Sequence, residues 1–168
     1  MEDNEAMLRT TASNRRIVIW NAAGSAVYAL SSFLLLIIVI RVCGEVEGGI
    51  FSIGYAIAQL MLTVGVFEST TYFATDAGNR FSYAQYLAFK IVTCALMVAA
   101  SAVYVLSFGF DAHKAAVAYA LVAYRLFEAL AQYWFAAFQK EERLELGGFS
   151  TVWRSVLSIA AFAAVLVL

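Results

Sequence analysis

The chain has 168 residues, of which 63% are apolar without counting glycine and only 14% are charged. Soluble domains are typically ~45–50% apolar with glycine included, and ~25% charged. The net charge of −1 excludes the basic surface that nucleic-acid-binding proteins need. A water-soluble globule of this length cannot bury so much apolar surface, so the composition indicates a membrane protein.

Long apolar runs follow one another along most of the sequence. A helix needs ~20 mostly apolar residues to cross a bilayer core of about 30 Å. Five such runs lie at about 17–40, 50–75, 83–108, 115–138 and 149–168. They follow an N-terminal tail, residues 1–16, whose acidic residues are atypical of a signal peptide. Because the connections are short, successive helices are antiparallel. The sequence predicts an all-α polytopic membrane protein, an antiparallel bundle of five transmembrane helices.

The distribution of Lys and Arg predicts how the bundle is oriented. Six of them lie in the tail and in the second and fourth connections, whereas two lie in the first and third. Cytoplasmic segments carry the excess of positive charge, so we expect a cytoplasmic N-terminus in the plasma membrane. The last run ends without a polar or interfacial aromatic anchor. We therefore expect residues 17–168 to be part of an N-terminal transporter lobe, incomplete at its C-terminus.

Each predicted span carries polar side chains along one face. Asn21 and Tyr28 lie on such a face in the first span, Gln59 in the second and Gln132 in the fourth. Polar rows of this kind join helices to one another when the side chains are small, and they line a water-accessible cavity in transporters. Both interpretations apply here, and five successive polar rows favour the cavity.

Charged residues inside the spans have separate explanations. Lys90 lies ~10 Å inside its span, where it either snorkels to the cytoplasmic interface or pairs with Glu68 of the preceding helix. Arg154 is interpreted as an interfacial anchor near the cytoplasmic end of its helix. Arg125 and Glu128 fall near mid-membrane, where a charge costs ~2.5–3.5 kcal/mol. Their spacing lets them neutralise each other, and the alternative is contact with a charged substrate or coupling ion.

Motifs for catalysis and metal binding are absent from the sequence. His113 is the single histidine, and we expect it to be solvated in an outer loop, outside any cluster of metal ligands. No nucleophile elbow, zinc-protease motif or phosphate-binding loop occurs. Cys43 and Cys94 lack a metal or redox spacing. We therefore predict that the protein is not an enzyme and holds no catalytic residue, metal or cofactor.

Two parts of the sequence carry a family pattern. The first is Asn14-Arg15-Arg16 and Trp20-Asn21, followed by the stretch Arg41-Val42-Cys43-Gly44-Glu45-Val46-Glu47-Gly48-Gly49-Ile50-Phe51. The second consists of residues 124–128, 139–144 and 150–154. These stretches resemble the opening and the fourth and fifth helices of bacterial polysaccharide exporters. Those proteins are the lipid-linked oligosaccharide flippases of the multidrug/oligosaccharidyl-lipid/polysaccharide superfamily. Their usual proline near the end of the first helix is absent here.

The resemblance implies a transporter of two similar lobes, of which this chain holds most of the first. It implies that a glycan on polyprenyl pyrophosphate is flipped across the plasma membrane for the biosynthesis of polysaccharides such as lipopolysaccharide or capsule. Other membrane proteins of polysaccharide assembly are expected partners. We expect substrate contacts from Arg125, Glu128, Gln132, Gln59, Tyr28 and Asn21, whereas Glu68, Lys90 and Arg154 are expected to be structural or interfacial charges. Two alternatives stay open: a multidrug efflux-type exporter of the same superfamily, and a non-transporting membrane-embedded interaction subunit.

Overall fold

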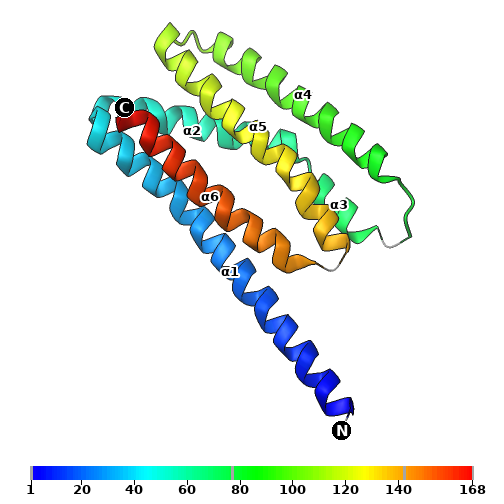
Figure 1. Cartoon of the computed structure of the whole chain (residues 1–168). Coiled ribbons are helices and arrows are strands. Elements are labelled where there is room, and N and C mark those ends of the chain that lie inside the picture. Colours follow the sequence, from blue (N-terminus) through cyan, green and yellow to red (C-terminus); the bar gives the residue numbers. More distant parts are fainter. Residues whose placement is uncertain (1, 77, 142, 168) are drawn as a thin grey trace. The chain divides into compact units, whose positions relative to one another are not determined.

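A computed structural model describes residues 2–76, 78–141 and 143–167. Within these ranges the chain is all-α, with five long helices and the short α3 (Figure 1). The helices are α1 (Glu2–Cys43), α2 (Glu45–Val66), α3 (Ser69–Thr75), α4 (Tyr83–Ser107), α5 (Ala112–Lys140) and α6 (Leu144–Val167). Met1 of the predicted tail, Leu168 of the predicted fifth span and Glu142 of the family pattern lie outside the described residues.

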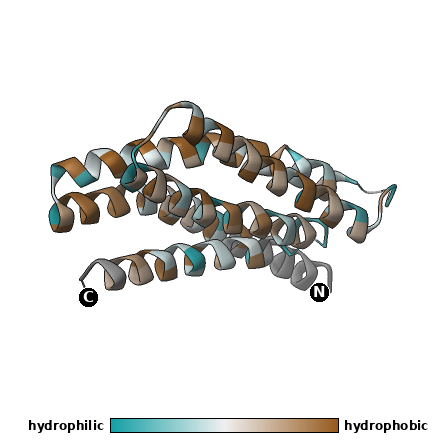
Figure 2. Cartoon of the chain, turned by 90° about the horizontal axis from the view of Figure 1, so that it is seen from above, coloured by the Kyte–Doolittle hydropathy of each residue, from teal (hydrophilic) through white to brown (hydrophobic). Residues whose placement is uncertain are grey.

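Among the described residues, four segments are long and apolar enough to cross a membrane. They are Ile17–Cys43, Glu45–Thr75, Tyr83–Ser107 and Glu145–Ala164. Figure 2 shows their ribbons as largely hydrophobic, with single hydrophilic residues between. The predicted span 115–138 is absent from this set, although α5 is a continuous helix over that range. Arg125, Glu128 and Gln132 make the middle of α5 more polar, and the buried face of α5 packs on other helices rather than on lipid.

The prediction of a loop between the first two spans, at residues 41–49, is wrong. Only Gly44 separates α1 from α2, and its φ of 94° is one that glycine adopts without strain. Glu45 and Glu47 lie in the first turn of α2, where acidic side chains favour the positive end of the helix dipole. The charges that indicate a loop in the sequence therefore begin a helix. The predicted tail is likewise helical from Glu2 onward.

The chain divides into two compact units, Met1–Ile38 with Glu142–Leu168, and Val39–Glu141. In the first unit α6 runs in the same direction as α1 (Figure 1). The two helices touch through glycine, because a Cβ on Gly148 would lie 2.5 Å from the Trp20 carbonyl oxygen and one on Gly24 would lie 3.1 Å from the Gly148 oxygen. Small residues let helix backbones approach closely in this way. The Trp20 and Phe149 rings pack edge to face at 5.2 Å beside this contact.

In the second unit α2 packs against both α4 and α5. Two glycines of α2 make the close approach. A Cβ on Gly54 would lie 3.1 Å from Leu121 of α5, and one on Gly65 would lie 2.7 Å from the Met97 sulfur of α4 and 3.1 Å from Ala129 of α5. Of the polar row in the predicted third span, Lys90 and Thr93 are buried in this packing, whereas Tyr86 and Tyr104 are half-buried.

The predicted span 50–75 is one helix in the sequence interpretation but two in the structure. Helix α2 ends at Val66, and Phe67 and Glu68 have positive φ angles of 40° and 50° before α3 begins at Ser69. The break exposes backbone carbonyls that a continuous helix would satisfy. Lys90 of α4 supplies the missing donors, because its Nζ donates to the Gly65 and Val66 oxygens at 3.3 and 3.2 Å.

Candidate functional site

Arg125 and Glu128 form a buried ion pair on α5, one turn apart. Their residues are only 1% and 4% exposed. The guanidinium also donates to the hydroxyl of Tyr55 on α2 and lies 4.6 Å from the centre of that ring. The ring of Tyr124 lies 5.5 Å away. The predicted neutralisation of Arg125 by Glu128 is present, and Tyr55 adds a link between α5 and α2.

Two of the other predicted substrate contacts, Gln132 and Gln59, lie in the same unit as this pair. Gln132 is half-buried on α5, one turn after Glu128, and Gln59 is exposed on α2. Asn21 and Tyr28 belong to the other unit, on α1. The Asn21 amide donates to the Ile17 oxygen of its own helix at 3.0 Å. Within the described part of the chain, Arg125 and Glu128 are the two of these six residues that bind each other.

Lys90 follows neither of its predicted alternatives. It is 1% exposed, so it does not snorkel to an interface, and its ammonium binds backbone carbonyls instead of Glu68. A cation at the C-terminus of α2 suits the negative end of the helix dipole. The Thr93 hydroxyl donates to the Gly65 oxygen at 2.9 Å. The Glu68 carboxylate accepts from Thr71 at 3.0 Å on the exposed side of the break.

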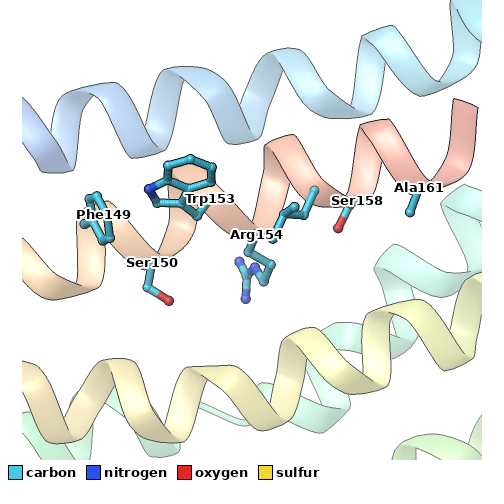
Figure 3. Close-up of a pocket in the computed structure, with 7 residues that line it drawn as sticks. Phe149, Ser150, Trp153, Arg154, Ser158 and Ala161 are labelled. Atoms are coloured by element: carbon cyan, nitrogen blue, oxygen red, sulfur yellow. The ribbon is translucent and has the colours of Figure 1, made fainter.

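Arg154 lies on a groove of about 660 Å³ along α6. Figure 3 shows its side chain and that of Ser150 pointing to the side of α6 away from α1, with the Trp153 ring on the side toward α1. The groove is lined by Phe149, Ser150, Trp153, Arg154, Leu157, Ser158 and Ala161. Because α6 begins five residues before the predicted span, Arg154 is nearer mid-segment than predicted.

A second groove, of about 480 Å³, lies beside the break between α2 and α3. Its polar groups come from Gln59 and Thr63 of α2, Glu68 of the break and Tyr72 of α3. The Thr63 hydroxyl donates to the Leu60 oxygen of its own helix at 2.6 Å. Gln59 has no hydrogen bond to any other side chain or backbone group within the described ranges, so its amide is available to a ligand.

Sequence reasoning missed an aromatic cluster around Lys140, at the C-terminal end of α5. The ammonium lies 5.4 Å from the ring centres of Phe73 and Tyr83 and 5.9 Å from that of Tyr86. Asp76 is 3.9 Å from it and also accepts from the Tyr86 hydroxyl at 3.0 Å. These residues come from α3, α4, α5 and a connection, so no local pattern reveals them. The cluster fixes the end of α5 to α3 and α4.

His113 lies in the first turn of α5 rather than in a loop. It is exposed, as predicted, and its Nε2 lies 2.9 Å from a carboxylate oxygen of Glu47 in the first turn of α2. The hydrogen bond and charge of Glu47 raise the pKa of His113 above its ordinary value. The two helix N-termini therefore meet through a contact that depends on pH.

Comparison of the chain with protein-family models, with curated proteins and with solved structures found no match. Among the described residues, no group of three or more His, Cys, Asp or Glu side chains is placed to hold a metal ion. The features of the described chain that point to a function are the buried ion pair, the two grooves and the four segments long and apolar enough to cross a membrane.

Proposed function

We propose that this chain is the N-terminal portion of a membrane transporter that flips lipid-linked oligosaccharide across the plasma membrane for polysaccharide biosynthesis. The observation that carries the proposal is the groove along α6, which combines Arg154, two serine hydroxyls and the rings of Phe149 and Trp153. These groups lie on a helix that is long and apolar enough to cross a membrane. An apolar segment with such a polar face suits a polar cargo that must pass the bilayer.

The chemistry of the groove fits a glycan joined to pyrophosphate. Arg154 is nine residues after Glu145, where the apolar segment begins, or ~14 Å at the rise of an α-helix. A charge at that depth is a functional-site hypothesis by default. A guanidinium binds phosphate oxygens through a planar, bidentate set of donors. Ser150 and Ser158 add hydroxyls, and the Trp153 ring offers a flat face to a sugar.

The arrangement of the spans in the membrane is inferred from the helix packing and from the resemblance to polysaccharide exporters. We infer a five-span bundle in which α5, the most polar span, is shielded from lipid by α2, α3 and α4. The polar rows of the other spans face a cavity shared with a second lobe. The lipid tail of the substrate stays in the bilayer, and the N-terminus is cytoplasmic.

Binding of a short-chain polyprenyl pyrophosphate disaccharide to the purified chain in nanodiscs tests the proposal. We expect native mass spectrometry to detect the complex, with Arg154→Gln reducing its fraction strongly and Arg154→Lys reducing it partly. Arg143→Gln, in the exposed connection before α6, is the matched control and should bind normally. Equal binding by the parent chain and by Arg154→Gln would refute the role of the groove. In cells, the full-length protein should restore polysaccharide export to a strain without its own flippase.

A further inference from the structure

The groove beside the α2–α3 break carries a carboxylate that no other part of the described chain neutralises. Glu68 is exposed within the segment Glu45–Thr75, which is long and apolar enough to cross a membrane. Its described partner is the neutral hydroxyl of Thr71, and the nearby cation Lys90 is bound to the Gly65 and Val66 carbonyls on the buried side of the break. An acidic group at membrane depth requires water or a cation beside it.

Two exposed aromatic rings flank this carboxylate. Phe67, the residue before Glu68, is 65% exposed and Tyr72, one turn into α3, is 70% exposed. Both rings line the groove together with Glu68. Aromatic faces attract cations, and proteins use this attraction to recognise quaternary ammonium groups. The groove volume of about 480 Å³ is within the range of ~300–1,000 Å³ that is typical of small-molecule sites.

The backbone holds these groups in place at a conformational cost. Phe67 and Glu68 are consecutive residues with left-handed φ angles of 40° and 50°, a conformation that glycine or asparagine adopts more easily at a helix end. The Lys90 hydrogen bonds maintain the break from the buried side. Strained backbone that the surroundings maintain in this way is characteristic of ligand sites.

We propose that this groove binds an amphipathic organic cation. The ammonium group lies against the Glu68 carboxylate, the apolar body packs on the Phe67 and Tyr72 rings, and the Gln59 amide and Thr63 oxygen face the polar side of the ligand. The charge of Glu68 favours a cation over a neutral glycan. The proposal goes beyond glycolipid transport and does not depend on it, because the α6 groove belongs to the other unit.

Binding of benzyltrimethylammonium to the purified chain in nanodiscs of uncharged lipid tests the proposal. We expect saturable binding in equilibrium dialysis above the level of empty nanodiscs. Glu68→Gln should weaken it by at least about tenfold, because it removes the charge and keeps the shape of the side chain. Tyr72→Leu should weaken it several-fold. Glu45→Gln changes an exposed acid at the other end of α2 and should bind as the parent chain does.

Two further measurements separate the cation from other ligands. Neopentylbenzene, the uncharged carbon isostere of the probe, should bind equally to the parent chain and to Glu68→Gln. Circular dichroism and size-exclusion chromatography check that the variants fold, as we expect for a side chain whose described partner is the exposed Thr71. Any one of three results would overturn the proposal. They are no saturable binding of benzyltrimethylammonium, unchanged binding by a folded Glu68→Gln chain, and displacement of benzyltrimethylammonium by a neutral methyl glycoside at equal concentration.

Discussion

Replacing one member of the Arg125–Glu128 pair should damage the protein more than replacing both. Arg125→Met leaves a carboxylate in a site that is 4% exposed, and breaking a buried pair in this way costs about 3–5 kcal/mol. The same variant loses the donor to Tyr55, a hydrogen bond to a charged group worth about 1.5–3 kcal/mol. Arg125→Met with Glu128→Leu removes both charges, and such double replacements are often neutral or stabilising.

The assay is equilibrium unfolding of the parent chain, both single variants and the double variant in mixed micelles, followed by circular dichroism. The double-mutant cycle should give a coupling energy of at least about 2–3 kcal/mol. Additive effects, with the double variant the least stable of the four, would refute the view that the pair is self-contained within α5 and α2. Polysaccharide export by the folded, full-length double variant then tests the substrate role expected for Arg125: loss of export supports that role, and normal export assigns the pair to packing.

Gly148→Ala should lower the free energy of unfolding by about 1–3 kcal/mol, because its methyl group overpacks the contact with α1. Gly49→Ala, whose new methyl has no atom within 4 Å, should leave the free energy of unfolding unchanged. Thermal unfolding of both variants measures the difference. Lys90→Met should cost about 2–3 kcal/mol through the lost cap of α2, and a Lys90→Met chain as stable as the parent would contradict the assigned hydrogen bonds. Because Glu47 raises the pKa of His113, their contact stabilises the fold below the unfolded-state pKa of His113 and loses this effect as the pH rises through the folded-state pKa. His113→Gln should remove that part of the pH dependence of the melting temperature, and an unchanged pH profile would exclude the contact as its source.

Four of the five predicted spans correspond to segments that are long and apolar enough to cross a membrane. They could be predicted because a long apolar run is visible in the sequence without any information about the helices that pack against it. The break at Phe67 and Glu68 could not be predicted in the same way. No proline or glycine occupies those two positions, and the hydrogen bonds that maintain the break come from Lys90, more than twenty residues later. A local pattern therefore extends the helix through 50–75, and tertiary contacts override it.

In the candidate site too, contacts within one helix could be predicted from the sequence, and contacts between helices could not. The Arg125–Glu128 pair is readable from a spacing of three residues on one helix, whereas the hydroxyl of Tyr55 reaches it from a different helix. Arg154 lies farther from the start of its helix than predicted, because α6 begins at Leu144 and not near residue 149. Helix ends are set by a few polar residues, so an error of one turn moves a charge from an interface toward mid-membrane.

The dependence of the α2–α3 break on Lys90 constrains how the protein enters the membrane. When residues 45–75 have been synthesised, α4 is still to be added. The Gly65 carbonyl then lacks its donors Lys90 and Thr93, and the Val66 carbonyl keeps the Ser69 hydroxyl but lacks Lys90. In lipid, a continuous helix is the arrangement that satisfies these groups without help. We therefore expect the segment to insert as one straight helix and to break only when α4 arrives. The same step brings the Lys90 charge into the bilayer already bound to its acceptors.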